Sequence, residues 1–296
     1  MPNRLDVPVR CVIEAGNTVG ESPVWSAAEQ ALYWVDILAP AIYRWHPESG
    51  ARHEWRLPAP VGSIGLREAG GMVAALRTGF HRFDPERGEV TFIAHPEPEV
   101  PTNRLNDGKV APDGAFWAGT MDDRPEKEPV GALYRLGADG QVQRMAHGFK
   151  ISNGLAWSPD GSVLYHSDSR AGVIWRRSHD MATGAIGDPE TFVALPPEWG
   201  RPDGGAVDAE GCYWGCGIGV GRVNRFSPAG ELISWIELPV THPTMPCFGG
   251  PDLRTLYITS LRENFTQEQL RATPLAGGLF EVPIDVAGTP VARYRG

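Results

Sequence analysis

The sequence has few cysteines, and none stands in a pattern that would bond or bind zinc. Four occur in 296 residues. Cys212 and Cys216 lie on one predicted strand, where a rise of about 3.3 Å per residue separates them by roughly 13 Å, too far for a disulfide. Cys11 and Cys247 belong to no CxxC spacing or disulfide framework. We therefore expect free thiols in a reducing compartment, without a redox or zinc role.

Basic clusters and long apolar runs are also missing. The formal net charge is −9, and Lys and Arg are not gathered in one segment, so the charge pattern of a protein that binds nucleic acid or an anionic membrane is absent. No run approaches the roughly 18 apolar residues of a membrane span, and residues 1–8 lack the apolar stretch of a signal peptide. We expect a cytoplasmic protein, a monomer or weak homo-oligomer, that binds a small molecule or a cation.

Two common kinds of hydrolase centre have no counterpart here. The Gly-x-Ser-x-Gly motif does not occur, and Gly62-Ser63-Ile64-Gly65 lacks its spacing. None of the eight His residues falls at a channel position identified below. His166 and His242 are the nearest, and we expect structural or substrate-side roles for both. Neither a covalent serine hydrolase nor a His-ligated metal is expected.

What the sequence does contain is a repeat of short strands. The clearest strands centre on Tyr33, Val73, Trp117, Tyr165, Trp214 and Tyr257, which are 40, 44, 48, 49 and 43 residues apart. A period in the forties built of short strands is typical of β-propeller blades. Since the repeat runs from end to end without a linker, we expect one all-β domain over residues 1–296, a six-bladed β-propeller of four-stranded blades.

Residues 8–14 precede the first repeat and have no place in its blade. Their simplest use is as an outer strand on the last blade, which would close the ring and cover two sheet edges. The two termini should then be neighbours.

Each repeat opens on a residue that precedes its central Tyr or Trp by ten to twelve positions. These opening residues are Glu21, Gly62-Ser63, Asn106, Asn153, Asp203 and Cys247. In a propeller the innermost strands run along a central channel, so equivalent positions of different blades converge there. The sequence thus predicts a ring of mostly oxygen-bearing side chains.

Turn chemistry is the plainer explanation for the Asn and Asp residues of this ring, because both tolerate positive φ. Position in the repeat argues against it for Asp203. Pro202-Asp203-Gly204 stands eleven residues before Trp214, in a blade that already has a hairpin turn at Glu210-Gly211. Glu21 is not a turn former at all. We therefore assign both carboxylates to the ring.

Glu21, Asn153 and Asp203 form an oxygen-only set with two negative charges. Converging carboxylates repel each other unless they are protonated or bridged by a cation. Oxygen ligands suit Ca²⁺, Mg²⁺ or Mn²⁺ better than the sites that usually select zinc. We expect one divalent metal ion, Ca²⁺ first, with Zn²⁺, Mn²⁺, Mg²⁺ or Fe²⁺ as alternatives, and with open positions for water and substrate.

Motifs along almost the whole chain resemble those of the gluconolactonase and regucalcin (senescence marker protein) family. The matching segments are residues 20–25, 103–109, 152–157, 202–204, 247–253 and 274–280. The last two are most similar to bacterial xylono-, arabinono- or glucono-lactonases. The resemblance implies a six-bladed propeller with one catalytic metal held by Glu21, Asn153 and Asp203, and hydrolysis of sugar lactones to aldonic acids. By the same matching, Arg104 and Asn106 contact the substrate.

Asp203 is the candidate general base, because it can touch the metal and accept a proton from water. One segment departs from the family. Several relatives carry an acidic residue after Gly-Thr-Met, and here the matching position is Arg124.

Two alternatives share the metal ligands: a metal-dependent aryl-ester or phosphotriester hydrolase, and a non-catalytic calcium-binding propeller. The polar Arg104 argues against the first, and the complete ligand set argues against the second.

Overall fold

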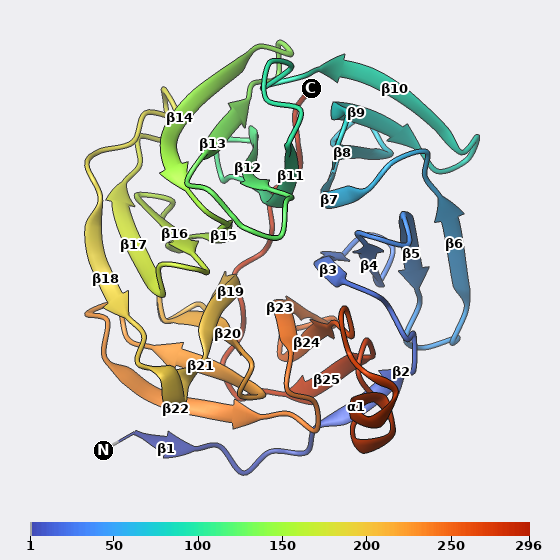
Figure 1. The fold of residues 1–296 in the computed structure, drawn as a ribbon, viewed down its shortest axis with the longest axis vertical. Coiled ribbons are helices and arrows are strands. Elements are labelled where there is room, and N and C mark those ends of the chain that lie inside the picture. The colour runs from blue at the N-terminus through green and yellow to red at the C-terminus, as the bar shows by residue number, and fades with distance from the viewer. Residues whose placement is uncertain (1) are drawn as a thin grey trace.

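The computed structural model, which describes residues 2–296, is a ring of six β-sheets around a central axis (Figure 1). Five blades are each built on four consecutive strands, numbered from the channel outward. They are β3 (Gly20–Ser26), β4 (Ala31–Asp36), β5 (Ala41–Trp45) and β6 (Arg52–Arg56); β7 (Val61–Leu66), β8 (Met72–Leu76), β9 (Gly79–Asp84) and β10 (Glu89–Ala94); β11 (Asn103–Val110), β12 (Phe116–Asp122), β13 (Gly131–Leu136) and β14 (Val142–Phe149); β15 (Ser152–Trp157), β16 (Val163–Asp168), β17 (Val173–Ser178) and β18 (Glu190–Ala194); β19 (Arg201–Val207), β20 (Tyr213–Ile218), β21 (Arg222–Phe226) and β22 (Leu232–Glu237). The predicted all-β propeller is confirmed.

The sixth blade joins the two ends of the chain. It consists of β23 (Pro243–Gly249), β24 (Thr255–Ser260), β25 (Leu279–Pro283) and β2 (Arg10–Ile13). Strand β2 pairs antiparallel with β25, with Cys11 opposite Phe280, so the predicted closure by the N-terminal segment is confirmed. In addition, β1 (Asn3–Arg4) runs parallel to β22 as a fifth strand of blade five, which the sequence did not predict.

The expectation that the termini are neighbours was wrong. After β25 the chain continues across the ring, along the ends of the inner strands, as the dark red trace of Figure 1 shows. Thr289 Oγ1 donates to the carbonyl of Val207 in blade five at 2.9 Å, whereas Tyr294 bridges to Arg67 in blade two. The last thirteen residues therefore form a strap (residues 284–296) beneath the channel, and the two ends of the chain lie on different blades.

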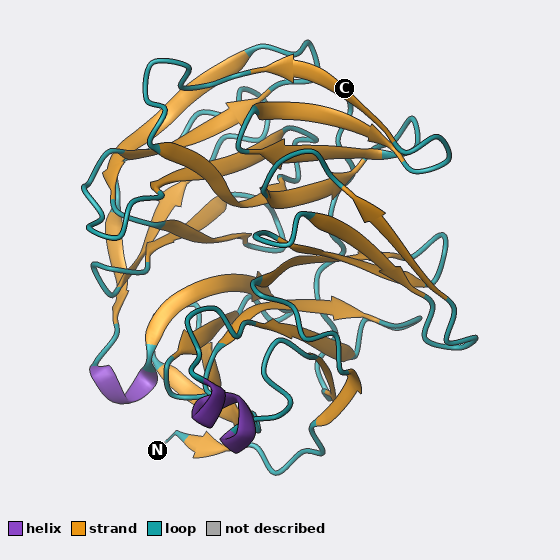
Figure 2. Cartoon of the chain, turned by 45° about the vertical axis from the view of Figure 1, so that its right-hand side comes forward, coloured by secondary structure: helices purple, strands orange, loops and turns teal. Residues whose placement is uncertain are grey.

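Glycines at the hairpin turns explain why the first and second strands of several blades connect so tightly. Gly114, Gly161 and Gly211 have φ of 81°, 73° and 81°, which side chains with a Cβ rarely adopt. In the loops lie a short 3₁₀ helix, η1 (Pro197–Trp199), and a short α-helix, α1 (Gln267–Ala272), seen in purple in Figure 2. Within residues 2–296 no helix is long enough and apolar enough to span a membrane.

Aromatic side chains pack at every boundary between neighbouring blades. Around the ring the pairs are Trp55–Phe83, Phe80–Phe116, Trp117–Trp157, Tyr165–Tyr213, Trp214–Phe248 and Tyr257–Trp25, with ring centroids 5.2 to 6.0 Å apart. Such pairs contribute about 0.5–1.5 kcal/mol each beyond their buried area. This packing fixes the blades against one another and so fixes the inner strands that form the channel.

Candidate functional site

A register shift interrupts each inner strand near its start. The shifts lie between Glu21 and Val24, Val61 and Ser63, Leu105 and Gly108, Asn153 and Ala156, Pro202 and Gly205, and Pro243 and Pro246. A β-bulge bends its strand and re-aims side chains. Because the shifts occupy corresponding places in all six blades, they turn a ring of side chains toward the channel.

The bulge also corrects the sequence assignment in blade six. Cys247 pairs regularly with Tyr257, two residues beyond the bulge, whereas Thr244 and Met245 occupy the bulge itself. The repeat spacing placed Cys247 in the ring because it could not reveal where the extra residues fall within each inner strand.

Three of the predicted ring residues touch one another. Asn153 Nδ2 donates to Asp203 Oδ1, and Asn106 Nδ2 lies 3.4 Å from Asn153 Oδ1 and 3.0 Å from the carbonyl oxygen of Ser152. None of the three ring side chains belongs to a residue more than 8% exposed. Strands β11, β15 and β19 thus bring Asn106, Asn153 and Asp203 together, as the sequence predicted.

Glu21 reaches the same cluster from β3, on the other side of the channel from β15 (Figure 1). Its carboxylate accepts a hydrogen bond of 2.8 Å from the backbone N–H of Ser22. Ser22 has a φ of 49°, a strained conformation for a residue other than glycine. Its hydroxyl accepts from the backbone N–H of Ile64 at 3.0 Å, which ties this strained turn to the next blade.

Burial and mutual repulsion act on the carboxylates of this cluster. Burial raises the pKa of Glu21 well above its ordinary value, and the charge of Asp203 raises it further. Burial likewise raises the pKa of Asp203, with Asp107 as the second cause. Sequence reasoning gave Asp107 no role, although it is only 2% exposed and its charge raises the pKa of both Glu21 and Asp203, which places it in the cluster. Its position directly after the ring residue Asn106 was the signal available in the sequence.

The residues present fit a divalent cation. Asp107 Oδ1 is buried and has no hydrogen-bond partner among residues 2–296, so the cluster contains more acceptors than donors. The nearby thiol of Cys216 is not a competing ligand, because burial raises its pKa well above the ordinary value and the charges of Asp203 and Glu21 add to the effect. An oxygen-only set of this kind suits a hard cation.

Arg104 lies next to the cluster and is held on two sides. Its Nη1 donates to Asn106 Oδ1 at 2.7 Å, and its Nε donates to Asp123 Oδ1 at 2.9 Å. Burial lowers its pKa to about 10, so the guanidinium remains charged near neutral pH. Arg104 and Asn106 therefore lie on the same side of β11, as predicted from their spacing.

Asp123 is the acid that sequence reasoning overlooked. It accepts from Arg104 and also from Arg77, whereas Arg124, the position matched to the acid of relatives, turns away and forms an ion pair with Asp122 at 2.7 Å. The signal was the Asp122-Asp123 pair directly after Gly-Thr-Met, but only the fold shows which of the two carboxylates faces Arg104.

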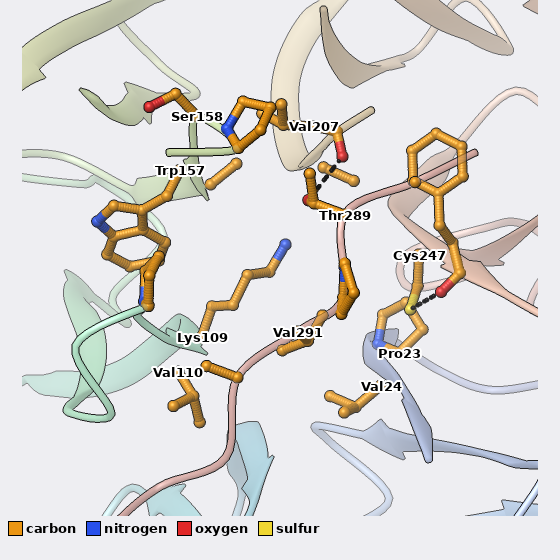
Figure 3. Close-up of a pocket in the computed structure, with 18 of the residues that line it drawn as sticks. Pro23, Val24, Lys109, Val110, Trp157, Ser158, Val207, Cys247, Thr289 and Val291 are labelled. Carbon is orange, nitrogen blue, oxygen red and sulfur yellow. Dashed lines mark hydrogen bonds between the residues drawn. The ribbon is translucent and has the colours of Figure 1, made fainter. Parts of the chain in front are cut away.

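Farther along the inner strands, the channel becomes an apolar cavity of about 410 Å³ (Figure 3). Val24, Val110, Trp157, Val207 and residues 288–292 of the strap are among its lining residues. Lys109 enters this space, and its Nζ donates to the carbonyl of Gly205. Burial lowers the pKa of Lys109, while Asp107 opposes the shift. Lys109 thus links the polar cluster, through Asp107, to the cavity that its side chain lines.

His166 contacts the cluster only indirectly, through Ser152. It is fully buried, and its Nε2 lies 2.7 Å from the hydroxyl of Ser152, whose carbonyl accepts from Asn106. The ring packs against Phe149 and Trp175. Burial lowers the pKa of His166 to about 3, so the side chain is neutral. These contacts agree with the structural alternative for this residue.

A second group of potential metal-ligating side chains lies outside the channel, at the first hairpin of blade five. Asp208, Glu210 and Cys212 lie close together there. Arg225 Nη2 contacts a carboxylate oxygen of Asp208 and one of Glu210, each at 2.7 Å. The guanidinium already supplies the positive charge that these carboxylates need.

Comparison with known proteins gives a consistent result. A family profile described as SMP-30/Gluconolactonase/LRE-like region matches residues 19–262. A 6-deoxy-6-sulfogluconolactonase of Pseudomonas putida is 42% identical over 292 residues, which cover 97% of this chain and 99% of that protein. Regucalcin of Xenopus laevis is 36% identical over 296 residues, or 98% of this chain and 99% of its own.

Solved structures agree with these relatives. The crystal structure of a calcium-binding protein, regucalcin, from Agrobacterium tumefaciens has a TM-score of 0.95, is 31% identical and covers 100% of both chains. A gluconolactonase of Xanthomonas campestris has a TM-score of 0.77 at 26% identity, over 94% of this chain and 90% of that one. The protein therefore belongs to the SMP-30/gluconolactonase/LRE-like family.

Proposed function

We propose that the protein hydrolyses a sugar-derived aldonolactone, a pentono- or hexonolactone, to the aldonic acid in a cation-dependent reaction. The observation that carries this proposal is the convergence of Glu21, Asn153 and Asp203 beside a hydrogen-bonded pair, Arg104 and Asn106. Membership of a lactonase family and the names of the relatives support the substrate class.

A divalent cation held by Glu21, Asn153 and Asp203 would supply Lewis acidity to the lactone carbonyl. Asp203 is the proposed general base. Its carboxylate would take a proton from water as the water oxygen bonds to the carbonyl carbon, and Asn153, which donates to Asp203 Oδ1, would hold it in place. When the bond between the carbonyl carbon and the ring oxygen breaks, the same proton can return to the leaving oxygen.

Arg104 and Asn106 would orient the sugar. Arg104 presents several N–H donors in a fixed plane, and Asp123 and Asn106 prevent the guanidinium from rotating away. Because both residues lie on β11 beside the carboxylate cluster, their donors can reach the hydroxyls or the ring oxygen of a lactone whose carbonyl faces Asp203.

The test is hydrolysis of a panel of neutral and acidic aldonolactones, followed by acid release at constant pH. Chelator-treated protein should be inactive, and adding Ca²⁺, Mn²⁺, Mg²⁺, Zn²⁺ or Fe²⁺ separately should restore turnover to different extents. An aryl ester and a phosphotriester belong in the same panel, and faster turnover of either would favour the alternative hydrolases. Tight Ca²⁺ binding without turnover of any substrate would instead favour a non-catalytic calcium-binding propeller, the property named for the Agrobacterium relative.

A further inference from the structure

Positive side chains gather near the carboxylate cluster at the end of the channel where the inner strands begin, here called the entrance, although the whole chain has a net charge of −9. They lie in the turn after β8, in the loop after β12, in the turn after β16 and at the start of the inner strands β11 and β19. These residues are Arg77, Arg104, Lys127, Arg170 and Arg201. The acids whose charges act on this group are Asp122, Asp123 and the exposed Glu263, together with Glu21 and Asp203 of the cluster itself. Asp122 already forms an ion pair with Arg124. Within residues 2–296, Arg77 and Lys127 of this group lack a carboxylate of their own.

Asp123 is one carboxylate shared by two guanidiniums. Arg104 Nε contacts its Oδ1 at 2.9 Å, and Arg77 Nη2 contacts its Oδ2. Arg104 is almost fully buried, whereas the Arg77 side chain is 38% exposed and makes no other ion pair within residues 2–296. Glu263, Glu21 and Asp203 also act on Arg104, but the ion-pair partner of Arg77 is the one carboxylate that it shares with Arg104. The exposed side of Arg77 is therefore open to a further anion.

Lys127 is a second cation here, and it lacks a direct ion pair among residues 2–296. Its side chain is half-buried, and its Nζ donates to the backbone carbonyls of Asp122 at 2.8 Å and Arg124 at 3.2 Å. No carboxylate lies within 4.0 Å of it in the described part of the chain. A partly desolvated ammonium is destabilising unless an anion accompanies it. Burial lowers the pKa of Lys127 and the charges of Arg104 and Arg170 lower it further, whereas Asp122 and Glu263 oppose the shift without direct contact.

A neutral sugar lactone offers no charge to match these cations, whereas an acidic one does. We propose that the substrate is an aldonolactone with an anionic group at the end remote from the reacting carbonyl, and that Lys127 and Arg77 bind that group. This anionic group is a phosphate, a sulfonate or a second carboxylate, all of which accept hydrogen bonds from a cation. This inference rests on the proposed lactonase function, because it places the lactone carbonyl at the carboxylate cluster and the anion at the entrance.

The experiment compares lactones that differ at one substituent: glucono-δ-lactone, the same lactone phosphorylated on its exocyclic hydroxyl, the lactone with a sulfonate in that place, and the corresponding aldaric lactone. We expect kcat/KM to be about tenfold or more higher for at least one anionic lactone, as one hydrogen bond to a charged group provides. Comparing kcat/KM among the three anionic lactones shows which anionic group the protein prefers. The preference should weaken as salt is added.

Three variants separate this role from a structural one. Lys127→Gln should reduce the preference for the anionic lactone about tenfold and leave kcat/KM for the neutral lactone within about twofold. Lys127→Arg should retain most of the preference. Arg52→Gln, which removes an exposed cation on β6, is the matched control and should leave the preference unchanged. A neutral lactone turned over as fast as the anionic ones, or a preference unaltered in Lys127→Gln, would overturn the inference.

A binding measurement keeps the inference distinct from the proposed function. Calorimetry with gluconate and with its phosphorylated counterpart, the open-chain products, requires no turnover. If no lactone is hydrolysed, the proposed function fails, yet tighter binding of the phosphorylated acid that is lost in Lys127→Gln would still support an anion site at the entrance. Equal binding of the two acids by the wild-type protein, or a preference that persists in Lys127→Gln, would count against it.

Discussion

Protonation of the unfolded chain at His166 should make the protein lose stability in mild acid. The side chain is fully buried between Phe149 and Trp175, and burial lowers its pKa from 6.5 to about 3. A base whose pKa is lower in the folded state stabilises the fold above its unfolded pKa, and this contribution is lost as the pH falls, because the unfolded chain takes up the proton first. The affected window is therefore roughly pH 6.5 to 3.

The magnitude follows from the same two values. Each pH unit below 6.5 removes about 1.4 kcal/mol from the free energy of unfolding. Between about pH 8 and pH 5 only the part below pH 6.5 counts, so the loss is roughly 2 kcal/mol. Other groups also titrate in this range. For that reason the measured quantity is a difference between the wild-type protein and His166→Gln, a side chain that can still bond to the hydroxyl of Ser152.

Urea unfolding of both proteins at the two pH values supplies the test. Whatever stability the variant loses at both pH values, its free energy of unfolding should fall by about 2 kcal/mol less than that of the wild type between them. His147→Gln, at an exposed position on β14, is the control and should behave as the wild type does. Equal losses in the wild type and His166→Gln would refute the reasoning, because His166 would then be protonated to the same extent in the folded and unfolded states.

Three further predictions concern the site and the ring. Asp203→Asn should weaken cation binding measured by calorimetry and lower kcat by roughly 10², the scale of lost electrostatic stabilisation, and full activity in that variant would contradict its proposed role. Asp123→Asn should raise KM for the lactone by about tenfold, because Arg104 loses a charged hydrogen bond, while cation affinity stays unchanged; an unaltered KM would show that Asp123 does not position Arg104. Deletion of residues 1–14 should uncover the edge of β25 and lower Tm by several degrees, which differential scanning calorimetry measures, and an unchanged Tm would show that β2 does not secure the ring.

The sequence determined the architecture because a propeller is built from local units. Each hairpin depends on turn residues and alternating strands that lie within about fifty residues, so the repeat predicted six blades, and the unplaced segment before it predicted the closing strand. The same periodicity placed Asn106, Asn153 and Asp203 on inner strands, where the structure brings them into contact. Equivalent positions of successive units must converge in a closed ring, so no long-range information was needed.

Only the tertiary structure decided what depends on register and on contacts between blades. The bulges set which residue of each inner strand faces the carboxylate cluster. They left Cys247 at the apolar cavity instead and brought Asp107 into the cluster. Loop geometry likewise decided which side chain contacts Arg104. Asp123 faces its guanidinium, whereas Arg124, at the position matched to the acid of relatives, forms an ion pair with Asp122. The strap of residues 284–296 crosses the ring through contacts with distant blades, such as the bond from Thr289 to Val207. Such contacts leave no periodic signal, because they join residues that the repeat does not relate.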